Sequence, residues 1–176
     1  MSDGIHLTEY HDKVRQWLVD NLPWLASIEY YPETRTSMVT PCAFFGVMDW
    51  ERAENQPMNG QLSVTLSCEV LAVLGMADAK YQLEVRNAAM AIGLKVEGAR
   101  FGLPVEPAVF ISAEPDGFNP ELDDYAVWSI RFSQNVEVGE DAFKPEGLAP
   151  AMVRVGVAPE IGAAHEADYV QVIPNE

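Results

Sequence analysis

Two long segments in which apolar and polar residues alternate constrain the fold more than any other feature of the chain. Residues 61–74 read QLSVTLSCEVLAVL, and residues 123–139 read DDYAVWSIRFSQNVEVG. Successive side chains of a β-strand point to opposite sides of a sheet, so each segment presents one apolar face and one polar face. The chain therefore needs a sheet that buries one face and leaves the other against water or a polar partner.

The apolar faces are formed by Leu62, Val64, Leu66, Cys68, Val70, Ala72 and Leu74 in the first strand and by Ala126, Trp128, Ile130, Phe132, Val136 and Val138 in the second. The polar faces carry Ser63, Thr65, Ser67 and Glu69 in the first strand and Ser129, Arg131, Ser133 and Asn135 in the second. Near the end of the first strand, Leu71 and Val73 make both faces apolar. This predicts that this end of the sheet is covered on both sides.

Two further segments have the spacing of amphipathic helices. In residues 6–22 the apolar side chains recur every three or four positions, and Pro23 follows where the pattern stops. Residues 77–97 show a second apolar stripe, and Gly98 provides a stop signal. The two helices have enough apolar surface to cover one face of the sheet.

The remaining strands are shorter. The segment IEYY within residues 24–37, residues 38–50 and residues 107–113 read as strands. In residues 38–50 we expect Cys42, Phe44, Met48 and Trp50 to share one face. The polar loop 51–60 is longer than a tight hairpin needs, which predicts a projecting loop.

The order of these elements predicts an α+β fold. We expect a mixed, largely antiparallel sheet with two helices packed on one face, plus a C-terminal hairpin extension. Residues 139–151 carry the Gly and Pro of a linker, and residues 152–173 contain the two strand-like segments of the hairpin. We therefore expect one domain at 1–143 and an extension at 144–176.

Charge and composition exclude several classes of protein. The 176 residues carry 27 acids and 11 bases, a net charge of −16, which argues against a protein that grips nucleic acid. No apolar run reaches the roughly 20 residues that cross a bilayer, so no membrane contact is expected. The N-terminal sequence lacks a signal peptide pattern, which predicts synthesis and retention in the cytoplasm. Cys42 and Cys68 are expected to be free, buried thiols.

A search for catalytic motifs gives no match. The chain has no Gly-x-Ser-x-Gly turn, no phosphate-binding glycine loop and no metal-ligand spacing, so we predict no catalytic, cofactor-binding or metal-binding residues. Two weaker options stay open. His165, in GAAHEADY, has acids close by and is able to act as a base, and the five acids of residues 114–124 invite comparison with calcium loops without matching their spacing.

The arrangement resembles the tail terminator (tail completion) proteins of long-tailed phages, the lambda tail terminator family and its relatives in tail-like particles. The resemblance covers residues 5–143. It is carried by the N-terminal helix, the alternating strand GQLSVTLSCEVLA, the helix ADAKYQLEVRNAAMAIGL and the late strand YAVWSIRFSQNVEVGEDAF. The C-terminal extension is an addition to this pattern, and the tail type, contractile or not, stays open.

The resemblance implies a non-enzymatic structural virion protein located in the tail and neck, after assembly in the host cytoplasm. It implies a homohexameric ring that caps the tail tube, stops tube growth and offers a joining surface to neck or head-completion proteins. The implied partners are the tail tube protein, a neck protein and the sheath protein where one exists, while DNA passes through the lumen without specific binding.

Two surfaces are predicted to make these contacts. The polar strand face, with Ser129, Arg131, Ser133 and Asn135, is expected to meet a neighbouring copy or the lumen. The loop residues predicted to face the tube or a neighbouring copy are Arg52, Glu54, Asn55, Gln56 and Asn59.

Two other functions remain open at this point. One is a small α+β ligand-binding module or enzyme that uses the His165 loop, which predicts a deep pocket. The other is an acidic inhibitor that binds a basic partner through net charge, which predicts binding that added salt weakens.

Overall fold

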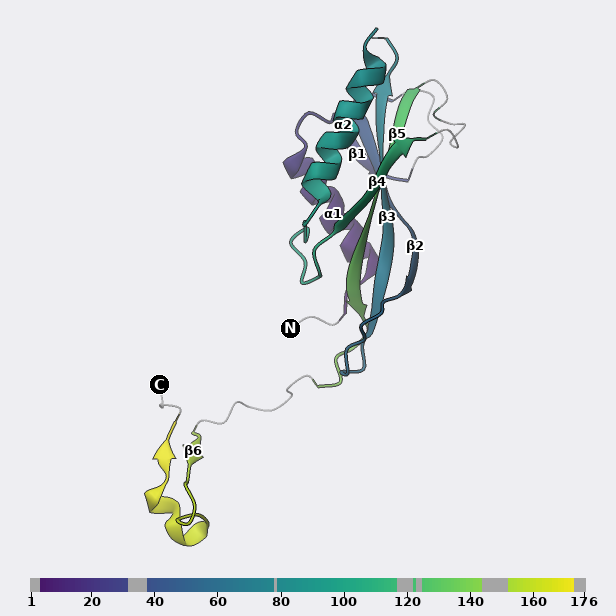
Figure 1. Cartoon of the computed structure of the whole chain (residues 1–176). Helices are drawn as coiled ribbons and strands as arrows, with labels where there is room; N and C mark the ends of the chain where they lie inside the picture. The colour runs from purple at the N-terminus through teal and green to yellow at the C-terminus, as the bar shows by residue number, and fades with distance from the viewer. Residues whose placement is uncertain are drawn as a thin grey trace. The chain divides into compact units, whose positions relative to one another are not determined.

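The computed structural model describes residues 4–31, 38–77, 79–116, 122, 125–143 and 152–172. The chain divides into two compact units, Met1–Ala142 and Phe143–Glu176 (Figure 1). The elements of the first unit are α1 (Leu7–Asn21), β1 (Ser27–Tyr30), β2 (Cys42–Arg52), β3 (Leu62–Gly75), α2 (Tyr81–Val96), β4 (Val109–Pro115) and β5 (Tyr125–Val138). Every helix and strand expected in this part of the chain is present, with ends shifted by a few residues.

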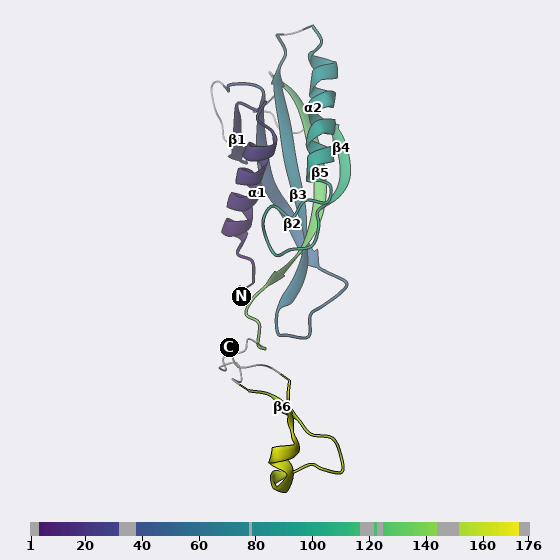
Figure 2. The same ribbon diagram turned by 90° about the vertical axis from the view of Figure 1, so that its left-hand side faces the viewer.

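The first unit is built on a five-stranded sheet in the order β1-β2-β3-β5-β4. β1 runs parallel to β2, and the other neighbours are antiparallel. Both helices pack on the same side of this sheet, as Figure 2 shows. The predicted α+β class, with a mixed and largely antiparallel sheet, is confirmed.

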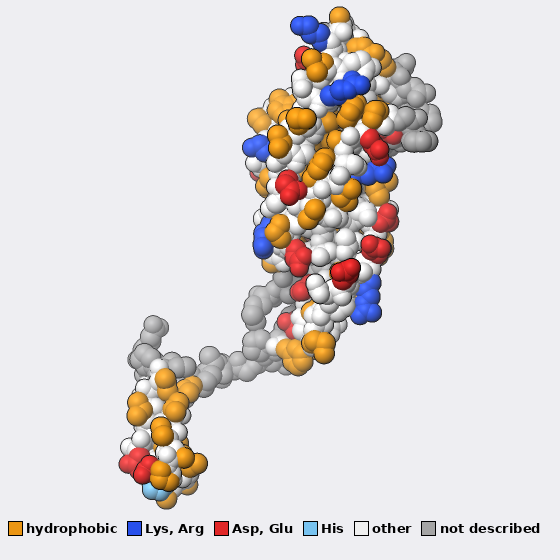
Figure 3. Space-filling model, viewed as in Figure 1, with side chains coloured by type: hydrophobic (Ala, Val, Ile, Leu, Met, Phe, Trp, Pro, Cys, Tyr) orange, Lys and Arg blue, Asp and Glu red, His pale blue; other side chains and the backbone are white. Residues whose placement is uncertain are grey.

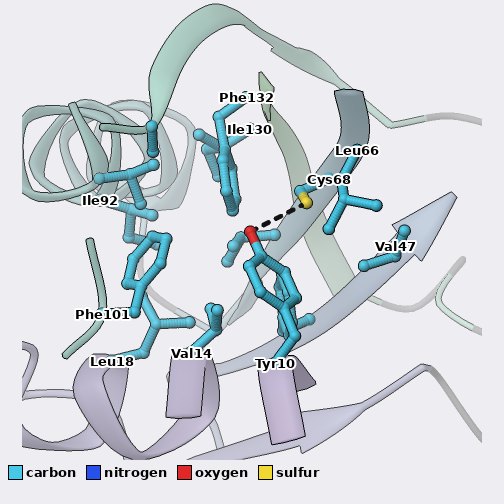
Figure 4. Packing of buried hydrophobic residues seen from close by; sticks show 14 of the residues in the cluster. Tyr10, Val14, Leu18, Val47, Leu66, Cys68, Ile92, Phe101, Ile130 and Phe132 are labelled. Atoms are coloured by element: carbon cyan, nitrogen blue, oxygen red, sulfur yellow. Dashed lines mark hydrogen bonds between the residues drawn. The ribbon is translucent and has the colours of Figure 1, made fainter. Parts of the chain in front are cut away.

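The main core lies between the sheet and the helices. The side chains of Tyr10, Val14 and Leu18 from α1 and of Ala89, Ile92 and Val96 from α2 are buried against the expected apolar faces of β3 and β5. Four aromatic rings form its centre, with Phe45 stacked on Phe132 at 6.2 Å between centroids and Phe101 edge-on to Tyr10 at 6.4 Å. Figure 4 shows how these side chains converge from both helices and the sheet.

A smaller cluster covers the opposite side of one end of the sheet. It is formed by Cys42, Phe44, Leu71, Val73, Leu122 and Val127. Leu71 and Val73 are buried on this second side while their neighbours Val70 and Ala72 are buried on the first. The prediction that this end is covered on both faces is confirmed.

The prediction that Cys42, Phe44, Met48 and Trp50 share one face of β2 is wrong. Cys42 and Phe44 lie on the second side, and a β-bulge between Val47 and Asp49 then shifts the pairing by one residue. Beyond the bulge Trp50 pairs with Leu66 and so lies on the helix side. One extra residue reverses the alternation, so Cys42 and Trp50 point to opposite faces.

The edge of the sheet next to β1 is closed by a side chain. β1 is four residues long, and the chain leaves it at Tyr31. The Tyr31 hydroxyl donates to the Val47 carbonyl at 3.1 Å and accepts from the Val47 amide at 3.3 Å. It thereby satisfies the backbone groups of β2 that β1 is too short to reach.

The second unit contains β6 (Arg154–Val155), the 3-10 helix η2 (Ala163–Asp168) and β7 (Val170–Gln171). β6 and β7 pair antiparallel, with Arg154 opposite Gln171 and Val155 opposite Val170. None of its described residues, 152–172, is buried. This hairpin occupies the segment in which the sequence predicted one.

Candidate functional site

The polar side of the sheet is internally paired rather than free. Ser129 is buried, and its hydroxyl donates to Glu69 Oε1 at 2.5 Å. The Arg131 guanidinium lies 3.6 Å from the same carboxylate and 3.3 Å from the carboxylate of Glu114 on β4. The side chains of Arg131 and Glu114 are both more than half exposed, so this pairing is screened by water and an external acid is able to compete for the arginine.

A second hydrogen-bonded group lies further along the same face. Asn135 accepts from the Thr65 hydroxyl at 2.6 Å and donates to Glu106 Oε2 at 2.8 Å. Ser133 lies between the two groups, opposite Ser67 on β3 and Val109 on β4. The structure therefore brings the four predicted residues of β5 onto one continuous polar face, and their contact with another copy stays a prediction.

The predicted residues of the loop between β2 and β3 are of two kinds: some are hydrogen-bonded to the loop or the strand that follows it, and the others are exposed. Gln56 donates to the carbonyls of Ala53 and Ser63, both at 2.8 Å, and so ties the two strands together. Asn59 is bonded to Gln61 through both its side-chain oxygen and its amide. The side chains of Arg52, Glu54 and Asn55 are exposed, so of the five predicted loop residues these three are the ones that a partner is able to reach.

A groove between α2 and β4 was not predicted from the sequence. It has a volume of about 760 Å³ and is lined mainly by apolar atoms of Ala89, Met90, Gly93, Leu94, Phe110, Ala113 and Trp128. Met90 is 68% exposed and Leu94 is 76% exposed. Figure 3 shows hydrophobic side chains gathered over this part of the molecule.

Polar contacts hold the walls of this groove, which we call the α2–β4 groove. The Arg86 guanidinium lies over the Trp128 ring, 5.2 Å from its centroid. About three helical turns further along α2, Glu97 Oε2 accepts a hydrogen bond from the Phe110 amide at 2.7 Å. Since β4 is the last strand of the sheet, its outer edge flanks an apolar surface.

The buried polar side chains of the core form a structural group. The Tyr10 hydroxyl donates to Gln134 Oε1 at 2.6 Å and lies 3.5 Å from Cys68 Sγ, a contact drawn in Figure 4. Gln134 Nε2 in turn donates to the carbonyls of Ala99 and Glu106. Burial, followed by the neighbouring thiol, raises the pKa of Tyr10, and burial raises the pKa of Cys68 to about 12. Both groups are therefore neutral at physiological pH and unsuited to act as a nucleophile or base.

His165 lies in the second unit. Its Nδ1 is 3.2 Å from Asp168 Oδ2, and both side chains are substantially exposed. Most of the acidic loop 114–124, including residues 117–121, lies outside the described residues. Among the residues that are described, no group of three or more His, Cys, Asp or Glu is arranged to hold a metal ion.

Cys42 and Cys68 are both buried, as expected. Neither helix in the described part of the chain is long and apolar enough to cross a membrane.

Comparisons with known proteins identify a similar fold. No protein-family model matches the chain, and no curated protein matches it. Among solved structures, the chain is similar to one from the "Virion of native gene transfer agent (GTA) particle", with a TM-score of 0.50 and 15% sequence identity. The similarity covers 72% of this chain and 90% of that chain. At 15% sequence identity this similarity shows the fold alone: the chain has the same fold as a chain of that virion particle.

Proposed function

We propose that this protein is a structural virion protein that caps the end of a phage tail tube as a ring. In this role it stops tube growth and provides the joining surface for the neck or head. The observation that carries the proposal is the fold similarity, because it extends over 90% of a chain taken from a virion particle. The resemblance of residues 5–143 to tail terminators points to the tail end of such a particle.

The surfaces of the first unit suit a ring subunit. A closed ring repeats one contact between two different patches of the same chain. The α2–β4 groove offers an apolar patch at one edge of the sheet, where Met90 and Leu94 are exposed. The polar face around Arg131 and Asn135 offers a hydrated surface with charged groups, which suits a wet interface or a lumen.

The mechanism is geometric. Subunits that dock on the last ring of the tube cover the surface to which the next tube subunit would add. The loop 51–60 is the proposed docking element, since Arg52, Glu54 and Asn55 are exposed there and Met58 is 92% exposed. The net charge of −16 allows DNA to pass with little adhesion.

The test is capping of tail tubes by the purified protein. When the protein is added to growing tail tubes, we expect it to halt their growth and to appear as a ring at one end in negative stain. Native mass spectrometry of the capped or free protein measures the number of subunits. Tubes that continue to grow in an excess of the protein would contradict the proposal.

Two matched variants separate ring formation from tube docking. Met90→Glu places a carboxylate in the groove and is expected to weaken contacts between copies, because burying an unpaired charge is costly. Met58→Glu is expected to weaken capping while leaving contacts between copies intact. Val39→Glu adds the same charge at an exposed apolar position outside both surfaces and is the control.

A further inference from the structure

The C-terminal hairpin has an apolar face that its own unit does not bury. Val155 is paired with Val170, and the Val172 amide donates to the Val153 carbonyl at 2.9 Å. These cross-strand pairs are two residues apart, so all four valines lie on one side of the hairpin. We call this side the valine face. Val155, Val170 and Val172 are 51%, 70% and 58% exposed.

The hairpin is shaped by specific contacts. The Tyr169 ring lies against Gly156, where an added Cβ would approach Tyr169 Cε1 to 2.5 Å. The Tyr169 hydroxyl accepts a hydrogen bond from the Gly162 amide at 2.7 Å. Nevertheless, strands of two residues without a buried side are too short to be stable alone in water. A valine face that is shaped but uncovered indicates docking on another apolar surface.

The α2–β4 groove has the matching properties. It is lined mainly by apolar atoms and lies beside β4, the last strand of the sheet, so the apolar side chains of a docked hairpin have a surface to cover. Exposed Met90 and Leu94 would lose their contact with water against the valines.

The two segments also have opposite charge. Residues 152–172 carry one base, Arg154, and three acids, whereas residues 79–100 carry four bases and two acids. In a chain with a net charge of −16, the segment that contains α2 is thus locally positive and the hairpin is locally negative. Opposite potentials favour and orient their encounter.

We propose that the valine face of the C-terminal hairpin of one copy docks in the α2–β4 groove of a second copy, so that each subunit holds the next. Hairpin and groove are different patches, so the contact runs head to tail and closes when the copies form a ring. This inference rests on one part of the proposed function, namely that copies of the protein lie next to each other in an assembly.

Cysteine cross-linking between two differently tagged chains tests the docking. One chain carries Leu94→Cys and the other Val170→Cys, and the native Cys42 and Cys68 are buried and do not compete. A disulfide forms only when the Cα atoms come within about 7 Å, so a product with both tags reports the docked geometry. We expect this product to exceed that of the control pair, Val39→Cys with Val170→Cys. Adding Met90→Glu to the Leu94→Cys chain should lower the yield about tenfold or more.

Two results overturn the docking. One is a yield no higher than that of the control pair. The other is a link that forms within a chain carrying both cysteines while the mixed chains do not link, which places the hairpin on its own groove. The capping assay keeps the two proposals apart. Protein that caps tubes without cross-linking refutes the docking alone, and protein that cross-links without capping refutes the proposed function alone.

Discussion

Replacing Gln134 by leucine tests whether buried hydrogen bonds hold α1 and the segment that follows α2 to the sheet. The Gln134 side chain is 1% exposed and links three parts of the chain. It accepts from Tyr10 on α1 at 2.6 Å and donates to the carbonyls of Ala99, at 3.1 Å, and Glu106, at 2.6 Å. Leucine has a similar volume but makes none of these bonds.

The expected loss follows from the groups left behind. The Ala99 carbonyl keeps its bond from the Ala108 amide, and the Tyr10 hydroxyl keeps only a weak contact with Cys68. The Glu106 carbonyl and the Tyr10 hydroxyl therefore lose their good partners, at about 1–3 kcal/mol each. Burial of the leucine methyl groups offsets about 1 kcal/mol of this. We expect the free energy of unfolding to fall by about 2–4 kcal/mol.

The assay is chemical denaturation followed by tryptophan fluorescence, since all four tryptophans lie in the first unit. The double-mutant cycle with Tyr10→Phe should show a coupling of about 1 kcal/mol or more, because both single variants remove the same bond. Gln16→Leu, on the exposed side of α1, is the control and should change stability by less than about 0.5 kcal/mol. A loss below about 1 kcal/mol for Gln134→Leu, or additive effects in the cycle, would refute the reasoning.

Burial raises the pKa of the Cys68 thiol from 9.0 to about 12, so the unfolded chain loses this proton at lower pH than the folded protein does. The protonated Cys68 thiol contributes its full stabilisation below pH 9.0, and this contribution falls by about 1.4 kcal/mol per pH unit as the pH rises towards the folded pKa. The free energy of unfolding, measured in urea at pH 8 and at pH 10, should therefore fall less for Cys68→Ala than for the wild type. Equal falls in the two proteins would contradict this. Gly46→Ala places a Cβ against the Tyr31 ring and should cost about 1–3 kcal/mol in thermal or chemical unfolding, whereas an unchanged stability would show that the ring does not cover Gly46. His165→Ala should leave tube capping and subunit number unchanged, and a variant that lost capping would assign the His165 loop a direct role.

Regular alternation made most of the fold predictable. β3 and β5 keep a strict period of two over their lengths, so their buried and polar faces are those expected from the sequence. The bulge at Met48 was not predictable from β2, because both possible registers place apolar residues on each side. Only pairing with β3 decides between them.

The unpredicted features had weak signals in the sequence. Gln134 occupies a core-facing position of β5, and a polar residue in an apolar series indicates a buried hydrogen-bonding group. Met90 and Leu94 lie on the side of α2 away from its buried stripe, which indicates a second apolar surface. The sequence alone did not show that β4 borders this surface, because the position of β4 at the edge depends on the order of strands.

The unequal edges of the sheet give the molecule a direction. On one side, the Tyr31 hydroxyl occupies the amide and carbonyl of Val47, so a foreign strand finds these two groups already bonded. On the other side, β4 ends the sheet, and the Glu97 carboxylate accepts a hydrogen bond from the Phe110 amide there. The two edges thus carry different groups, a tyrosine hydroxyl at one and a carboxylate at the other, which disfavours mirror-like pairing of two identical margins and favours polar, sequential association.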